Sequence, residues 1–118
     1  MPDRIRLRKS AGTWVIRAGG AILGETSRAL ELSEGERAPV IYFPRADIAM
    51  PFFEPSVART RSPVLGEALH FDIVTPAGTL ADAAWSYEHP EPGFEAIAGH
   101  VAFRLDRVTL ERTAERAL

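Results

Sequence analysis

The chain has 118 residues, of which 46% are hydrophobic and 25% charged, and this composition fits a globular domain and excludes a disordered or fibrous protein. The net charge of −2 and the isoelectric point of about 5.9 argue against a nucleic-acid-binding surface, because phosphate backbones attract an excess of basic residues. Because the sequence contains no cysteine, disulfides, thiolate nucleophiles and cysteine-based zinc sites are excluded.

We expect a single domain over residues 1–118, located in the cytoplasm. No stretch approaches the roughly 18 consecutive apolar residues of a membrane-spanning helix. The first residues also lack the apolar stretch of a secretory signal peptide. A polar tail is predicted for residues 113–118. Neither a membrane nor a nucleic acid is therefore expected as a partner.

The first part of the chain predicts three short strands. Residues 4–8 alternate between arginine and apolar side chains, with the period of two that indicates a strand with one buried face. Residues 13–18 and 21–26 predict a hairpin, because Gly19 and Gly20 between them tolerate the positive φ angles of a tight turn.

The middle of the chain is less regular. Residues 28–32 fit either a strand or one helical turn, and residues 40–43 predict a compact apolar strand. Residues 44–66 contain four prolines, which exclude a long helix and a central strand. Several large apolar side chains lie in the same stretch, so we expect an ordered, proline-rich loop that packs on the domain. Ordered long loops are often binding loops.

The second half predicts strands again. Residues 69–74 and 79–87 form a predicted second hairpin, residues 94–98 a short helical turn, and residues 99–105 and 108–111 the last strands. Many short strands without strand–helix alternation predict a mainly β fold, with an antiparallel sandwich or barrel-like pair of sheets.

Several segments together are typical of one family. They are Tyr42-Phe43-Pro44-Arg45 with Asp47, Glu54-Pro55-Ser56 with Thr60, then Pro63 and Gly66, Ala84-Trp85-Ser86-Tyr87, and Gly99-His100-Val101-Ala102-Phe103. In this order and spacing they resemble domain-of-unknown-function family 427, which carries a nucleotidyltransferase-like label, from about residue 14 to residue 108. The resemblance implies an antiparallel, tent-like fold in which two small sheets meet at an angle. It implies no established reaction.

The sequence departs from the family pattern at two places. Residues 62–66 read Ser-Pro-Val-Leu-Gly, where the resemblance implies Cys-Pro-aromatic-Lys-Gly. His70 stands where relatives tend to have tyrosine. We therefore expect no mechanism in this chain that uses that cysteine or lysine.

Polar residues around the proline-rich loop form the first candidate site. The planar guanidinium of Arg45 matches a carboxylate or phosphate in two parallel hydrogen bonds, so it predicts a clamp for a small anionic ligand. The alternative is an internal salt bridge from Arg45 to Asp47 or Glu54 that fastens the loop. With the aromatic residues of the next cluster, the candidate ligand-binding residues are Tyr42, Arg45, Asp47, Glu54, Ser56, Thr60, Trp85 and Tyr87.

The second candidate site lies at the end of the strand predicted for residues 79–87. Trp85 and Tyr87 share one face of this strand, where they form either a stacking platform for a ligand or part of the core. Glu88, His89 and Asp47 are the candidates for an acid or base. Adjacent strand residues point in opposite directions, so Glu88 and His89 act on one atom only if the chain turns after them.

The remaining patterns predict neither a metal nor a cofactor. The three histidines lack the spacing of metal ligands, and His70 and His100 are expected to be hydrogen-bonded in apolar surroundings. No Asp-x-Asp pair and no phosphate-binding glycine loop occurs, which argues against nucleotidyl transfer.

The sequence therefore favours a domain that binds a small anionic ligand and leaves two alternatives open. One is a small enzyme that uses Glu88, His89 or Asp47 as acid or base. The other is a protein-interaction or homodimer module. Its surface would be made by Phe52, Phe53 and the edge strand with Ile5 and Leu7.

Overall fold

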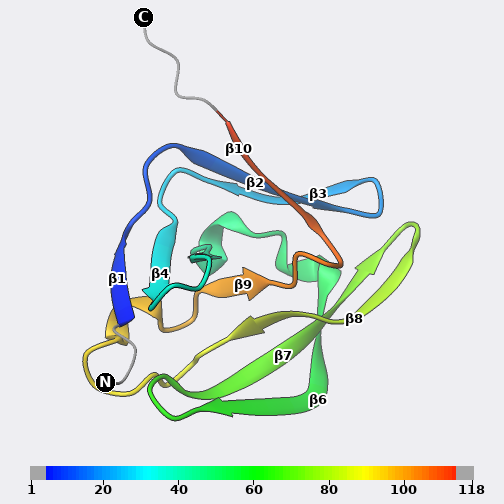
Figure 1. Cartoon of the computed structure of the whole chain (residues 1–118). Helices are drawn as coiled ribbons and strands as arrows, with labels where there is room; N and C mark the ends of the chain where they lie inside the picture. Colours follow the sequence, from blue (N-terminus) through cyan, green and yellow to red (C-terminus); the bar gives the residue numbers. More distant parts are fainter. Residues whose placement is uncertain (1–4, 114–118) are drawn as a thin grey trace, which may run out of the picture.

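Strands make up most of residues 5–113, which are the part of the chain that the computed structural model describes (Figure 1). The strands are β1 (Ile5–Lys9), β2 (Thr13–Ala18), β3 (Ala21–Thr26), β4 (Leu30–Glu34), β5 (Val40–Tyr42), β6 (Phe53–Ser62), β7 (Gly66–Thr75), β8 (Gly78–Ser86), β9 (Val101–Phe103) and β10 (Thr109–Thr113). Three short 3-10 helices are η1 (Arg45–Asp47), η2 (Met50–Phe52) and η3 (Glu95–Ile97). The predicted mainly β, antiparallel fold is confirmed.

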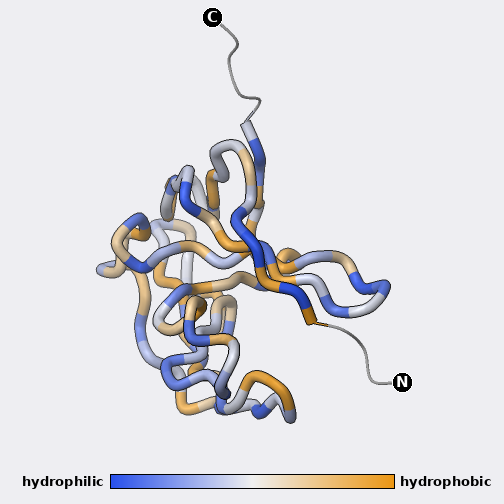
Figure 2. Tube along the Cα trace, turned by 90° about the vertical axis from the view of Figure 1, so that its left-hand side faces the viewer, coloured by the Kyte–Doolittle hydropathy of each residue, from blue (hydrophilic) through white to orange (hydrophobic). Residues whose placement is uncertain are grey.

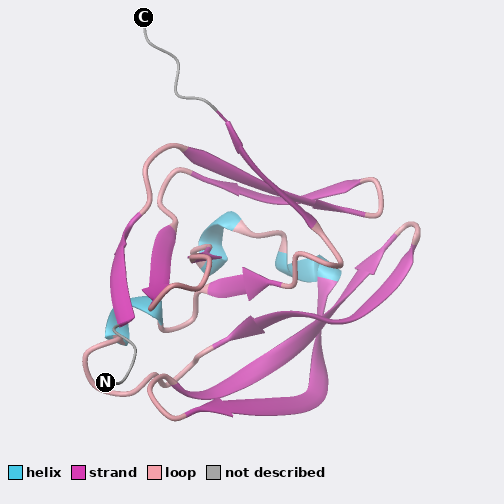
Figure 3. Cartoon of the chain, viewed as in Figure 1, coloured by secondary structure: helices cyan, strands magenta, loops and turns pink. Residues whose placement is uncertain are grey.

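The strands form three sheets, where the sequence predicted two (Figure 3). Their orders are β1-β4-β5, β10-β2-β3 and β6-β7-β8-β9. The first and third sheets meet at a single bridge, in which Phe43 and Val101 exchange backbone hydrogen bonds of 2.8 and 2.9 Å. The next antiparallel pair along this ladder would use Arg45, but the chain turns into η1 at that residue, so the ladder does not continue into a larger sheet.

The proline-rich segment is ordered as predicted, but it is not one loop: residues 44–52 form a loop that contains η1 and η2, and residues 63–65 form the turn before β7. The prediction of a loop was wrong for residues 53–62, which form the long strand β6. Pro55 is tolerated there because, among the described strands, β6 is an edge strand that pairs with β7 alone, and the pairing shifts between Pro55 and Arg59. The exclusion of a central strand therefore holds.

The other elements follow the predicted order. Gly19 and Gly20 adopt positive φ angles of 54° and 79° in the turn of the first hairpin. The segment predicted as either strand or helical turn forms β4, and a 3-10 turn, η3, lies within residues 94–98. Figure 2 shows the alternation of apolar and polar residues along β1, near the start of the described chain. Residues 114–118 of the predicted tail lie outside the described residues.

Two apolar clusters fill the space between the sheets. The larger contains Phe43, Phe53, Phe71 and Phe103, whose rings meet edge to face at centroid distances of 5.6 to 6.3 Å. The smaller contains the buried residues Leu32, Tyr42, Leu65, Ala68, Tyr87, Ile97 and Ala102, with Trp85 packed against it. This smaller cluster forms the floor of the site described next.

Candidate functional site

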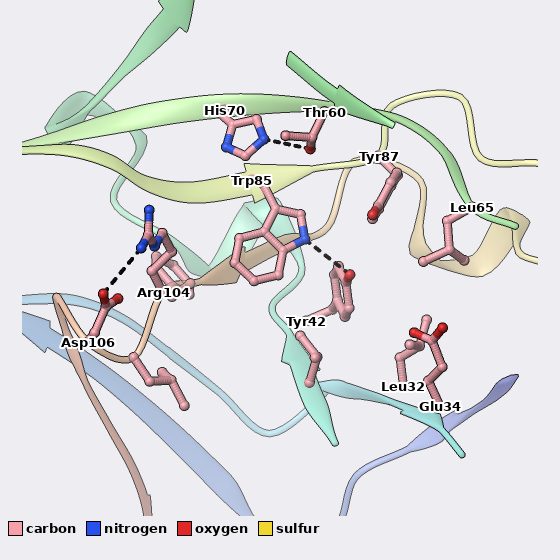
Figure 4. Close-up of a pocket in the computed structure, with 13 residues that line it drawn as sticks. Leu32, Glu34, Tyr42, Thr60, Leu65, His70, Trp85, Tyr87, Arg104 and Asp106 are labelled. Carbon is pink, nitrogen blue, oxygen red and sulfur yellow. Dashed lines mark hydrogen bonds and ion pairs between the residues drawn. The ribbon is translucent and has the colours of Figure 1, made fainter. Parts of the chain in front are cut away.

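A pocket of about 530 Å³ lies above the smaller cluster and is bordered by side chains from β4 to β9 (Figure 4). Its lining residues are Leu32, Glu34, Val40, Tyr42, Thr60, Leu65, His70, Trp85, Tyr87, Phe103, Arg104, Leu105 and Asp106. The walls therefore combine aromatic and aliphatic side chains with five polar or charged ones, Glu34, Thr60, His70, Arg104 and Asp106.

Three aromatic side chains form the centre of the pocket. The alternation along β8 and its continuation places Trp85 and Tyr87 on one side of the chain, as predicted, and both line the pocket. The Trp85 Nε1–H group donates a hydrogen bond of 3.2 Å to the hydroxyl oxygen of Tyr42. Tyr42 and Tyr87 are buried, and burial, with a contribution from the negative charge of Glu34, raises the pKa of both phenols. Both hydroxyl groups therefore keep their protons near neutral pH.

Polar side chains lie at three places in the pocket: one on β6 and β7, and one at each end. His70 Nε2 and Thr60 Oγ1 are 2.8 Å apart, which satisfies one ring nitrogen of the histidine. Arg104 and Asp106 pair at 3.2 Å at one end. Glu34 lies at the other end, near Tyr42 and Tyr87 (Figure 4).

Half of the predicted ligand-binding residues meet in this pocket. Tyr42, Thr60, Trp85 and Tyr87 line it, whereas Arg45, Asp47, Glu54 and Ser56 are absent from its lining. Sequence reasoning missed Glu34, Leu65 and Arg104 and placed His70 in the core. The available signal was the departure from the family pattern, because Leu65 and His70 are two of the departing positions and both line the pocket.

Arg45 makes an internal salt bridge, but with neither of the two predicted partners. Its Nη2 atom lies 2.6 Å from Glu88 Oε2 and 3.2 Å from Ser86 Oγ, and Ser86 Oγ donates a 2.6 Å hydrogen bond to the same Glu88 oxygen. The guanidinium also lies over the ring of Phe71, 5.6 Å from its centre. The prediction of Asp47 or Glu54 as the partner was therefore wrong. The alternation along β8 turns Ser86 toward η1, away from the face of Trp85, so the segment that contacts Arg45 is the end of β8.

The other predicted polar residues have separate roles. Asp47 accepts hydrogen bonds from Thr26 Oγ1 at 2.7 Å and from Arg28 at 3.0 Å, which ties η1 to the end of β3. Ser56 donates a hydrogen bond to Asp82, and Glu54 is exposed. These hydrogen bonds connect separate backbone segments, and the three side chains do not converge on a common site.

The three candidates for acid–base chemistry are dispersed. The carboxylate of Glu88 is held by Arg45 and Ser86, and that of Asp47 by Thr26 and Arg28. His89 is exposed and does not line the pocket. Within residues 5–113, no group of three histidine, aspartate or glutamate side chains is placed to hold a metal ion. Nor does any helix in the same range have the length and apolar character to cross a membrane.

The salt bridge of Glu88 predicts a dependence of stability on pH. Partial burial raises the pKa of this carboxyl, but the hydrogen bond from Ser86 and the charge of Arg45 prevail and hold its pKa below the usual range. The pair therefore stabilises the fold above the unfolded-state pKa of about 4.3, and this contribution is lost as the pH falls through the lower folded-state pKa. We expect the stability difference between the wild type and Glu88→Gln to shrink in acid. Urea unfolding at neutral and acidic pH measures it, and a constant difference would contradict the assignment.

Comparison with known proteins supports a family assignment. No curated protein matches the chain. The model of the family described as Domain of unknown function (DUF427) matches residues 6–114, which extends the resemblance seen in the sequence at both ends. Because the match covers nearly all of the chain, we conclude that this protein belongs to the DUF427 family.

Proposed function

We propose that this DUF427 protein is a small-molecule-binding domain and that its site is the pocket around Trp85. The observation that carries the proposal is the pocket itself, whose volume of about 530 Å³ falls in the range of ligand sites. Such sites combine apolar and aromatic walls with a few polar groups that orient the ligand. Tyr42, Trp85 and Tyr87 supply the aromatic walls here.

The arginine side chains bear on whether the ligand of this pocket is an anion. An anionic ligand was predicted from Arg45, whose guanidinium is engaged by Glu88 away from the pocket lining. Arg104 is the arginine that lines the pocket, and it is paired with Asp106. An anion that binds in the pocket would have to compete with Asp106 for this guanidinium.

The two other functions predicted from the sequence gain less support. The residues proposed for acid–base chemistry are engaged in internal contacts or lie outside the pocket lining. Of the residues proposed for a protein interface, Phe53 is in the core, and Phe52, Ile5 and Leu7 pack against the core clusters.

Replacing Trp85 by leucine tests the proposed site. An aromatic contact with a planar ligand contributes about 1–3 kcal/mol, so affinity should fall roughly 5- to 150-fold. The chain has two tryptophans, and each gives one indole N–H signal in a ¹H–¹⁵N correlation spectrum. A fragment screen should therefore yield ligands that shift the Trp85 signal and leave that of Trp14 in place.

Trp14→Leu is the matched control, because Trp14 lies outside the lining of this pocket. This variant should retain the affinity of the wild type for the selected fragments. The proposal fails if no fragment shifts the Trp85 signal, or if Trp85→Leu binds the fragments as tightly as Trp14→Leu does.

A further inference from the structure

We infer that the pocket takes a ligand with a primary ammonium group, held between the carboxylate of Glu34 and the hydroxyl groups of Tyr42 and Tyr87. This inference rests on the proposed function and specifies the chemistry of the ligand. It reverses the charge predicted from the sequence for the group that binds.

The three side chains converge from separate elements on one end of the pocket. Glu34 ends β4, Tyr42 ends β5, and Tyr87 directly follows β8. Figure 4 shows the two hydroxyl groups and the carboxylate directed toward the same part of the pocket. The proximity is also apparent electrostatically, because the charge of Glu34 contributes to the raised pKa of both tyrosines.

The negative charge of Glu34 is weakly compensated within the described part of the chain. Its salt-bridge partner there is Arg37, at a distance of 4.0 Å, and the Arg37 side chain is 75% exposed. Exposed pairs of this kind contribute little, because water screens both charges. Arg104 lines the same pocket, but it lies at the end opposite Glu34, beside Asp106 (Figure 4). Compared with the cations of residues 5–113, a cationic ligand group would thus supply a closer counter-ion for Glu34.

The hydrogen-bonding capacity of these groups matches a primary ammonium. Such a group carries three donors and no acceptor, whereas a carboxylate and two phenol oxygens provide at least three acceptors. The Tyr42 oxygen accepts one hydrogen bond from Trp85 Nε1 and has a second lone pair available. A carboxylate ligand would meet the like charge of Glu34 at this position. Apolar side chains beside the site, Leu32, Val40 and Leu65, favour an apolar body on the ligand.

The experiment compares three probes that share a phenyl body and differ in the end group. They are 2-phenylethylamine, which is a primary ammonium at neutral pH, 2-phenylethanol and 3-phenylpropionate. Each is titrated into the full chain, and the shift of the Trp85 indole signal reports binding in this pocket. A shift of the Trp14 signal reports binding in the separate pocket of about 640 Å³ that Trp14 lines. We expect the amine to bind at least roughly tenfold more tightly than the alcohol or the carboxylate, because hydrogen bonds to charged groups are the stronger ones.

The Glu34→Gln variant tests the contact directly. It keeps the shape of the side chain and removes the charge, so it should weaken binding of the amine roughly tenfold and leave binding of the alcohol unchanged. Glu36→Gln is the matched control, since Glu36 is exposed in the turn after β4 and does not line the pocket.

Two results would overturn the inference while the proposed function stands. One is an alcohol or carboxylate that shifts the Trp85 signal with at least the affinity of the amine. The other is undiminished binding of the amine to Glu34→Gln. If none of the three probes shifts the Trp85 signal, the ammonium inference is also overturned, and the fragment screen separately decides the proposed function.

Discussion

Replacing Phe43 by alanine is expected to lower the free energy of unfolding by about 3–5 kcal/mol. Its side chain is fully buried and meets the ring of Phe103 edge to face at 5.6 Å. The residue also occupies the bridge to Val101 that joins the first and third sheets, so surrounding atoms have little freedom to close the cavity. Urea unfolding followed by circular dichroism measures the loss.

Phe52→Ala is the matched control for this prediction. Phe52 is partly exposed and packs against the edge of the same cluster, so its truncation should cost clearly less. Phe43→Leu leaves a smaller cavity and should therefore cost less than Phe43→Ala. Equal losses for Phe43→Ala and Phe52→Ala would contradict the central place of Phe43 in the core.

Replacing Arg45 by alanine is expected to cost about 2 kcal/mol of stability and to leave ligand affinity unchanged. Breaking a fully buried ion pair costs about 3–5 kcal/mol, and an exposed pair contributes less than about 1. The Arg45 and Glu88 side chains are 36% and 28% exposed, so the expected loss lies between these limits. The variant also loses the contact with Phe71 and leaves Ser86 and Glu88 without their cation.

Arg17→Ala is the matched control, because Arg17 and Glu111 are 2.7 Å apart while both side chains are about half exposed. Its stability should change by less than about 1 kcal/mol, although the ion-pair distance is nearly the same. If Arg45→Ala is as stable as Arg17→Ala, the structural role of the salt bridge is wrong. If Arg45→Ala instead loses affinity for ligands of the Trp85 pocket, the anion clamp predicted from the sequence regains its support.

The local signals of the sequence were sufficient for most of the fold. Alternation and turn residues predicted the hairpin around Gly19 and Gly20, whose positive φ angles are a local requirement. The strand β6 was missed because Pro55 argues against a strand until the chain is known to lie at an edge. Edge position is a property of the whole sheet, which no short window of sequence contains.

The candidate site could be predicted only in part, because some of its contacts also depend on the whole fold. Trp85 and Tyr87 were grouped correctly because strand alternation alone places them on one side. Arg45 was assigned to the same site because it is close in sequence to Tyr42, but the two side chains contact different residues. The approach of Glu34 to these tyrosines depends on how β4, β5 and β8 pack, and sequence spacing does not encode it.

The irregular edge strand β6 also affects how the protein behaves at high concentration. Regular, unpaired edges of sheets recruit strands from other molecules and thereby start aggregation. Along β6, Pro55 offers no N–H group, and Arg59 Nη1 donates to the carbonyl oxygens of Ser56 and Ala58 at 2.9 and 2.8 Å. An incoming strand would thus meet an interrupted row of backbone hydrogen-bonding groups beside the positive charges of Arg59 and Arg61. Strand β6, the longest edge strand among the described residues, therefore resists intermolecular pairing.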